Sequence, residues 1–277
     1  MKRVLLVFLT AIFFLLSGCT MREFRLVQRK TEDGCVYYVA DWKWKKDEPV
    51  VILCHGLGGS HVDMESAAEY FYRKGYLVVT FDLYGSEGVR YGSDILIDEM
   101  VEKSAEKIES ILDGLRQAKN CDPSRYILYG YSLGGMTAFY QAAFGETKPS
   151  MIISMASVPD FEEILKSSLE KKRLKYDAEK WRLVYTTGQE NRRMLQWAAQ
   201  KNPANRIQQL AQIPIVMING TEDESMPIQS AEEFKKQVER AGGRIWLYEN
   251  QGGTHQDLGD YHTEEVFEIV QEIVPAD

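Results

Sequence analysis

The sequence predicts an α/β fold in which a mostly parallel central sheet has helices on both faces. Short apolar runs alternate with amphipathic helical segments from residue 50 to residue 273. Strands that are buried on both faces read as continuous apolar runs, and parallel strands need helical connections between them. The 277 residues and the hydrophobic content of 44% suit one large domain with an ample core.

This alternation can be followed element by element along the chain. Two antiparallel strands are expected first, before a charged turn at 43–49 and the apolar run that begins at Val50. The expected strands are 24–28, 35–40, 50–54, 76–81, 126–129, 151–155, 213–219 and 244–249. The expected helices are 62–74, 95–119, 133–144, 230–241 and 263–273.

Residues 160–210 interrupt the alternation with a polar segment of helical composition. About 50 residues between two strands exceed an ordinary helical crossover. We expect a small helical cap insertion over the carboxyl edge of the sheet, where open α/β folds bind ligands. One long amphipathic crossover without a substrate role is the alternative.

The first 18 residues have the composition of an export signal. Lys2 and Arg3 precede an apolar run over 4–16, which is shorter than the ~20 residues that span a bilayer. The ending Leu16-Ser17-Gly18-Cys19 resembles a bacterial lipobox, which implies removal of residues 1–18 and a lipid on Cys19. An ordinary cleaved signal and an uncleaved anchor are the alternatives. The domain proper would then run from residue 19 to residue 277.

Charge and cysteine content narrow the set of partners. The formal net charge is −8 and becomes −10 once the two positive residues Lys2 and Arg3 are removed. This charge argues against nucleic acid as a partner and against electrostatic adhesion to anionic lipid, so attachment to a membrane would rest on the lipid anchor.

The remaining cysteines fit no metal site. Cys54 is expected to be a buried thiol, whereas Cys35 and Cys121 could form a disulfide outside the cytoplasm.

The most informative motif is Gly130-Tyr131-Ser132-Leu133-Gly134, which Gly135 follows. It lies between an expected strand and an expected helix, which is the setting of a nucleophile elbow. Glycines permit a close, strained turn, and the N–H groups that begin the next helix face the serine oxygen. The pattern predicts Ser132 as a nucleophile; a glycine-rich turn with an idle serine is the alternative.

A nucleophilic serine needs a base on the same edge of the sheet. Of the four histidines, His255 follows the last expected strand in a glycine-rich loop and satisfies this best. His262 is a weaker alternative, and His55 and His61 fit less well. His55 is expected to brace the loop that it begins.

The base in turn needs a carboxylate to orient it. Asp223 follows the expected strand 213–219, and we expect it to fix the imidazole tautomer. Glu222 and Asp160 are the alternatives, and capping of the next helix is a competing role for Asp223. The chain order Ser132, Asp223, His255 is that of α/β-hydrolases.

An oxyanion hole needs two backbone N–H donors that are already in place. Leu133 follows the nucleophile and should supply one of them. The second is expected from Leu57, in the loop His55-Gly56-Leu57-Gly58-Gly59 after an early strand. A plain glycine turn is the alternative reading of that loop.

Together these motifs, with Phe81-Asp82-Leu83-Tyr84-Gly85-Ser86, resemble the α/β-hydrolase superfamily over about residues 30–275. Within it the chain looks most like small bacterial carboxylesterases related to dienelactone hydrolases and prolyl-oligopeptidase catalytic domains. The resemblance implies hydrolysis of carboxylic esters through an acyl-enzyme, with no metal and no organic cofactor. Dienelactone hydrolases use a cysteine nucleophile, so Ser132 argues against lactone chemistry. The absence of a β-propeller argues against a peptidase.

Several alternatives remain open at the level of the sequence. They are a serine peptidase or thioesterase, a lipase acting on bilayer lipid, and a non-catalytic binding lipoprotein. A peptidase would need an amine site, for which Glu162 and Glu163 are candidates. Tyr84, Trp181, Trp197 and Met226 are candidate substrate contacts, and packing in the core is the alternative, since aromatic and Met residues at helical spacing are more often core. An aromatic pocket would suit a feruloyl or acetylated-carbohydrate ester.

Overall fold

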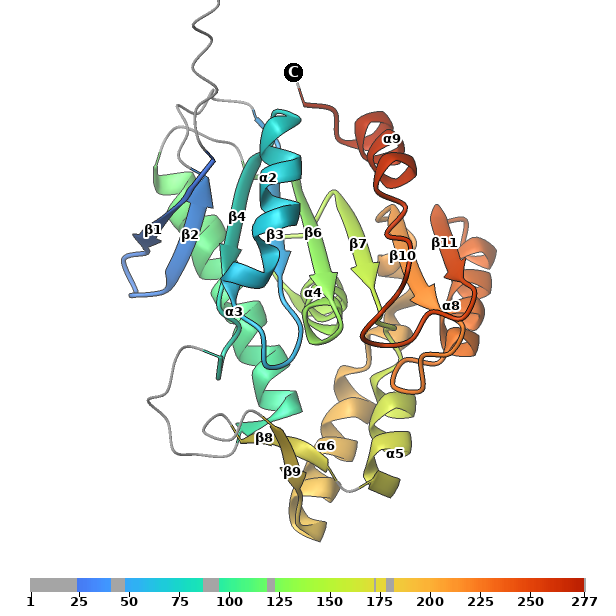
Figure 1. The fold of residues 1–277 in the computed structure, drawn as a ribbon. Helices are drawn as coiled ribbons and strands as arrows, with labels where there is room; N and C mark the ends of the chain where they lie inside the picture. The colour runs from blue at the N-terminus through green and yellow to red at the C-terminus, as the bar shows by residue number, and fades with distance from the viewer. Residues whose placement is uncertain are drawn as a thin grey trace, which may run out of the picture.

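An eight-stranded sheet forms the centre of the computed structural model, which describes residues 24–40, 48–86, 95–118, 123–171, 173–177 and 182–276 (Figure 1). Its strand order is β1-β2-β4-β3-β6-β7-β10-β11. Only the pairs β1·β2 and β2·β4 are antiparallel among these neighbours. The strands are β1 (Leu26–Lys30), β2 (Val36–Ala40), β3 (Val50–Cys54), β4 (Leu77–Phe81), β6 (Tyr126–Tyr131), β7 (Met151–Met155), β10 (Ile215–Gly220) and β11 (Ile245–Asn250). The mostly parallel sheet that the sequence predicts is confirmed.

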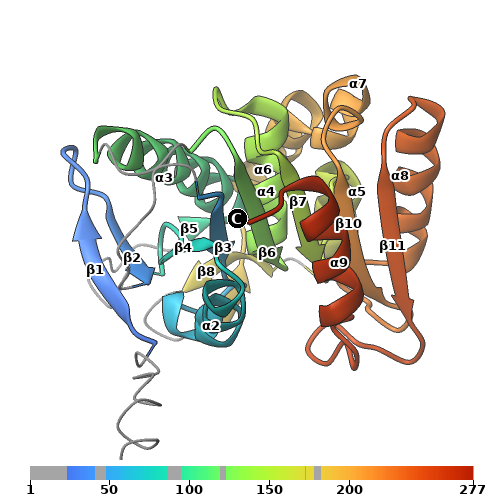
Figure 2. The same cartoon turned by 90° about the horizontal axis from the view of Figure 1, so that it is seen from above.

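Helices cover both faces of this sheet. On one face lie α2 (Glu65–Arg73), which a short 3-10 helix (η1, His61–Met64) precedes, and α9 (Thr263–Ile273). On the other face lie α3 (Ile97–Gln117), α4 (Leu133–Phe144) and α8 (Ile228–Arg240), as the view from above shows (Figure 2). The ends of the predicted helices differ from these bounds by two residues or fewer, apart from η1 at the start of α2.

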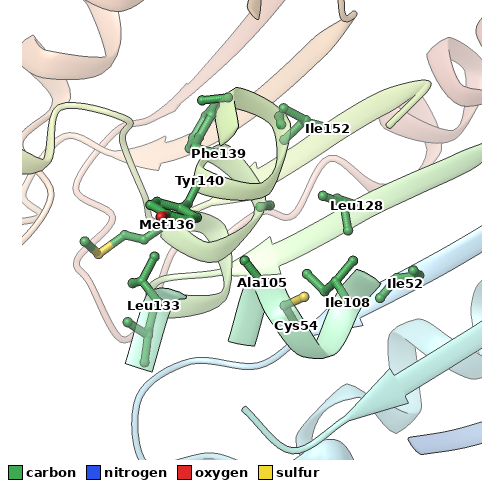
Figure 3. Close-up of a cluster of buried hydrophobic side chains, with 14 of the residues drawn as sticks. Ile52, Cys54, Ala105, Ile108, Leu128, Leu133, Met136, Phe139, Tyr140 and Ile152 are labelled. Carbon is green, nitrogen blue, oxygen red and sulfur yellow. The ribbon is translucent and has the colours of Figure 1, made fainter. Parts of the chain in front are cut away.

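Two hydrophobic layers fill the space between sheet and helices. Alternate residues of β3 pack in different layers, because successive side chains of a strand point to opposite faces of the sheet. Val50, Ile52 and Cys54 pack on the side of α3 and α4, whereas Val51 and Leu53 pack on the side of α2 and α9. Figure 3 shows part of the first layer, in which residues of β3, β6, α3 and α4 meet. Cys54 is fully buried there, as expected, and burial raises the pKa of its thiol.

Residues 160–210 form a cap that is only partly helical. It contains α5 (Phe161–Lys171), β8 (Arg173–Asp177), β9 (Arg182–Tyr185), α6 (Gly188–Lys201), η2 (Pro203–Arg206) and α7 (Ile207–Leu210). The strands β8 and β9 form an antiparallel hairpin, which extends to the two-residue strand β5 (Ile95–Leu96). The expectation of helices alone is wrong here, because it rests on the polar composition and overlooks the alternation of charged and apolar residues over 173–177, which is typical of a strand.

The cap lies at the carboxyl ends of the parallel strands, where their arrowheads point in Figure 1. An ion pair joins α6 to α3: Arg193 Nη2 lies 3.2 Å from the Asp98 Oδ2 atom, which is almost fully buried. Trp197 of α6 stacks on Tyr140 of α4 and on Phe161 of α5, with ring centroids 6.0 and 5.6 Å apart. These contacts fix the position of the cap above the sheet edge.

Several expectations concern residues outside the described part of the chain. The signal at 1–18, the lipid site Cys19 and the disulfide partner Cys121 all lie there, and these expectations stay predictions. Within the described ranges, no helix is both long enough and apolar enough to cross a bilayer.

At Gly134 the backbone of α4 comes very close to the sheet. A Cβ atom on this residue would lie 2.1 Å from the carbonyl oxygen of Cys54 on β3. We expect Gly134→Ala to lower the free energy of unfolding by about 3 kcal/mol, because backbone must move to relieve the overlap. Urea denaturation measures this change.

Gly188, the first residue of α6, provides the matched control. A Cβ atom there would meet only the flexible end of Arg192, at 3.7 Å. Gly188→Ala should therefore be neutral or stabilise by about 0.5 kcal/mol. Equal effects of the two substitutions would contradict the close approach.

Candidate active site

Ser132 occupies a strained turn between β6 and α4. Its backbone angles are φ 52° and ψ −115°, a conformation that non-glycine residues rarely adopt. The turn is held at both ends: the Ser132 N–H donates to the Met155 carbonyl at 2.9 Å, and the Ser132 carbonyl accepts from the Met136 N–H at 3.0 Å. Gly130 permits the turn, because a Cβ there would lie 2.3 Å from the Gly134 carbonyl oxygen.

Two hydrogen bonds connect Ser132 to the residues expected as base and carboxylate. Ser132 Oγ lies 2.9 Å from His255 Nε2. His255 Nδ1 lies 2.8 Å from Asp223 Oδ2. Asp223 and His255 come from the loops that follow the neighbouring parallel strands β10 and β11, so both reach the same edge of the sheet. The structure thus brings together all three residues that the sequence singles out.

The side chain of Asp223 is completely buried, and both of its carboxylate oxygens accept hydrogen bonds. Its second oxygen, Oδ1, accepts hydrogen bonds from the backbone N–H groups of Ser225 at 2.8 Å and Met226 at 2.9 Å. These bonds turn the loop ahead of α8 and leave Oδ2 directed at the imidazole. Since a carboxylate can only accept, His255 Nδ1 carries a proton in this arrangement and Nε2 is free to accept one from Ser132.

The alternative carboxylates lie elsewhere. Asp160 Oδ1 accepts from the Glu163 N–H at 3.1 Å and from Asn202 Nδ2 at 3.0 Å, so it caps the start of α5. Glu222 is exposed to solvent. Neither is the residue that contacts His255.

The other histidines have structural partners. His61 Nδ1 lies 2.8 Å from Asp82 Oδ1, and the His61 ring stacks on Tyr38. His262 Nε2 lies 2.6 Å from Asn250 Oδ1 at the start of α9. Only His255 among the four contacts Ser132.

His55 is fully buried and braces the loop after β3. Its Nδ1–H donates to the Gly56 carbonyl at 2.7 Å, and its Nε2 accepts from the Leu83 N–H at 2.9 Å. Acceptance of a proton at Nε2 requires the neutral imidazole, and burial lowers the pKa of His55 accordingly. This ring ties the loop after β3 to the loop after β4.

The two expected oxyanion donors flank Ser132. Leu133 begins α4, where a backbone N–H has no acceptor within the helix. Leu57 occupies the turn that the Gly59 N–H closes onto the Gly56 carbonyl at 3.1 Å, with Gly58 at φ 76°. This turn lies beside the nucleophile, because a Cβ on Gly56 would be 3.6 Å from Ser132 Cβ. The fold therefore places both loops beside Ser132, and their role as oxyanion donors stays a prediction.

Tyr131 is a residue that the sequence analysis does not single out. Its hydroxyl donates to the backbone carbonyl of His255. Its ring supports the oxyanion loop, because a Cβ on Gly56 would be 3.0 Å from Tyr131 Cδ1. Position 131 directly precedes the nucleophile, and strand alternation places it on the α2 and α9 side. That alternation is the signal that could have identified it.

The four residues that are candidate substrate contacts lie in different surroundings. Tyr84 is partly buried, and its N–H donates to Ser104 Oγ at 2.9 Å. Met226 is buried beside Asp223. Trp197 lies in the aromatic stack between α4 and α5, where it fixes the cap. Trp181 lies outside the described residues. Across the described ranges, no group of three or more His, Cys, Asp or Glu side chains is placed to hold a metal ion.

His55 makes stability depend on pH in a specific direction. Its folded-state pKa lies below the unfolded value of about 6.5, so below that pH the unfolded chain binds a proton that the folded protein excludes. Stability should therefore fall as the pH drops, by up to about 1.4 kcal/mol per pH unit from this residue.

The measurement is the free energy of unfolding at pH 7.5 and at pH 5, for the wild type and for His55→Gln. The variant should be less stable at pH 7.5 but should lose less stability on acidification. Identical losses in the two proteins would show that the neutral imidazole is not required.

Comparison with known proteins supports the architecture. A family model described as "alpha/beta hydrolase fold" matches residues 49–182. No curated protein matches the chain. Among solved structures, the protein TT1662 from Thermus thermophilus superimposes with a TM-score of 0.65 at 16% identity, covering 92% of this chain and 100% of that chain.

Two further solved structures have names that state an activity. An esterase from Thermogutta terrifontis gives a TM-score of 0.64 at 17% identity, covering 92% of this chain and 94% of that chain. The acylaminoacyl peptidase of Pyrococcus horikoshii gives 0.64 at 15% identity, covering 92% of this chain but 42% of that chain. These similarities, with the sheet order and the matched residues, show that the chain has the α/β-hydrolase fold.

Proposed function

We propose that the protein is a serine hydrolase that cleaves carboxylic esters of small or carbohydrate-linked substrates. The single observation that supports this most strongly is the hydrogen-bonded series Ser132–His255–Asp223, with distances of 2.9 and 2.8 Å. A strained serine, a histidine in its neutral tautomer and a buried carboxylate are the parts that nucleophilic acyl transfer requires.

The reaction follows from this geometry in two halves. Ser132 Oγ attacks the ester carbonyl carbon while its proton passes to His255 Nε2, and the Leu57 and Leu133 N–H groups stabilise the oxyanion. His255 then gives that proton to the leaving alcohol, and an acyl-enzyme remains. In the second half a water molecule attacks the acyl carbon while His255 takes its proton. His255 then returns this proton to Ser132 Oγ as the Oγ–acyl bond breaks and the free acid leaves.

Asp223 supports the histidine at each stage. Its buried oxygen orients the ring and stabilises the imidazolium that forms when the serine proton moves. Two backbone N–H groups hold the carboxylate in place, so little reorganisation is needed during the reaction.

The contacts of the cap argue against an aminopeptidase. Glu162 Oε1 pairs with Lys166 Nζ at 2.6 Å, and Glu163 Oε2 accepts from Ser230 Oγ at 2.6 Å. Both carboxylates that could bind a substrate amine are thus engaged within the protein. We rank ester hydrolysis above aminopeptidase activity for this reason, and above a non-catalytic binding role because Ser132, His255 and Asp223 are joined by hydrogen bonds. Thioesterase activity stays an alternative.

We further propose that the protein is exported and anchored to a bacterial membrane through a lipid on Cys19. The support is the basic, apolar and lipobox-like sequence of residues 1–19. Mass spectrometry of the membrane fraction would detect the lipid on Cys19, and Cys19→Ala should release the protein from that fraction.

Substitution of the nucleophile tests the proposed reaction. Ser132→Ala should reduce hydrolysis of p-nitrophenyl acetate by about 10⁴-fold or more, because the attacking oxygen is lost. Ser150→Ala, outside the site, should leave the rate unchanged. A folded Ser132→Ala variant with wild-type activity would exclude the proposal.

The carboxylate gives an independent test. Asp223→Asn should lower kcat by about 10⁴-fold, because an amide does not fix the required imidazole tautomer. A fluorophosphonate should label the wild type but not Ser132→Ala. A panel of p-nitrophenyl esters, sugar acetates, feruloyl esters and aminoacyl amides then ranks the substrates, and a preference for the amides would reverse the order of esterase and peptidase.

A further inference from the structure

A cavity lies on the face of the sheet that α2 and α9 cover, behind Ser132 and His255. We call it the α2/α9 cavity. Its volume is about 600 Å³, which is well within the range of small-molecule sites. Ile153 and Ile218 belong to its floor, on β7 and β10, and α2 and α9 contribute the walls through residues such as Ala67 and Val266. Figure 1 shows β6 and β7 between these two helices, and Figure 2 shows that both helices lie on the same face.

Tyr131 separates this cavity from the triad. Tyr131, Gly56 and Gln256 line the end of the cavity nearest the triad, whereas Ser132 and His255 are absent from its lining. The Tyr131 ring packs closely beneath Gly56, and its hydroxyl holds the His255 loop. An ester bound in the α2/α9 cavity is therefore screened from Ser132, and the cavity is distinct from the site of hydrolysis.

The lining identifies the class of ligand. Six of its 17 lining residues are aromatic, and their rings present both faces and edges: Tyr70 and Phe267 meet at 90°, and Phe71 and Tyr129 at 74°. Such walls favour a ring-containing ligand through offset and edge-to-face contacts. The side chains that line a cavity of this size lack dispersion contacts on one side, and a bound apolar molecule would supply them.

Charge complementarity favours an uncharged ligand. None of the residues that line the cavity in the described chain is Lys, Arg or His, so an anion would meet no positive charge in the lining itself. Lys74 lies outside the lining, with its Nζ already over the Phe267 and Tyr70 rings, 4.5 and 5.4 Å from their centroids. The one carboxylate, Asp63, already accepts from the Ser60 N–H at 2.6 Å and would repel an anion. We infer that the α2/α9 cavity is a second binding site, which takes an uncharged aromatic or alicyclic small molecule.

Binding of the neutral fluorophore N-phenyl-1-naphthylamine tests this inference without any measurement of catalysis. The full chain should bind one equivalent saturably, and Ser132→Ala should bind it with the same Kd. Ala67→Trp, which fills the cavity from α2, should weaken binding by about tenfold or more. The negatively charged anilinonaphthalene sulfonate should bind at least about tenfold more weakly than the neutral fluorophore.

Glu69→Trp is the matched control, because it adds the same side chain to α2 at a position outside the cavity lining. Its Kd should stay within about twofold of the wild type. If Ala67→Trp does not fold, Ser66→Trp introduces the indole from an exposed lining position instead.

Two results would overturn the inference. One is a lack of saturable binding to the wild type. The other is an unchanged Kd in the folded cavity-filling variants. Equal affinity for the anionic fluorophore would overturn the assignment of an uncharged ligand. None of these results depends on whether Ser132 hydrolyses esters, so the two proposals can fail separately.

Discussion

The close contact between the start of α4 and the end of β3 is the constraint on which the rest of the site depends. Gly134 lets the helix backbone approach Cys54 so closely that even a methyl group would overlap. That approach sets the sharp turn at Ser132, whose φ of 52° projects its oxygen from the sheet edge. The strain in this turn is of the order of 1–3 kcal/mol and is held by backbone hydrogen bonds to β7 and within α4.

The loops around Ser132 are held by side chains that take no chemical part in the proposed reaction. His55 joins the loop after β3 to the loop after β4. Tyr131 joins the elbow to the His255 loop and lies under Gly56. His55 directly follows the end of β3, and Tyr131 is the last residue of β6, so each lies where a strand passes into a loop. The rigid sheet therefore fixes the positions of the loops that carry the candidate site.

The sequence was sufficient to predict the sheet, its helices and the grouping of Ser132, Asp223 and His255, because apolar runs and turn glycines are local signals. The β8–β9 hairpin was missed, although charged and apolar residues alternate along β8 as in a strand, because the high content of charged residues over 160–210 is also typical of exposed helices. Tyr131 was also missed, because its hydrogen bond to His255 spans 124 residues and depends on strand register. Trp197 was a candidate substrate contact, and its stack with Tyr140 and Phe161 could not be predicted because it arises only when α4, α5 and α6 pack together.

The wide spacing of the triad along the chain has a consequence for folding. Ser132 and His255 are 123 residues apart, and the loops that carry Asp223 and His255 follow the last two strands of the sheet. During synthesis the proposed nucleophile Ser132 emerges long before Asp223 and His255, so we expect it to stay unactivated until β10 and β11 have docked. Contacts of such high sequence separation form late, after much chain entropy has been lost. Recovery of reactivity at Ser132 after dilution from denaturant would consequently report completion of the sheet, later than probes of local helix formation.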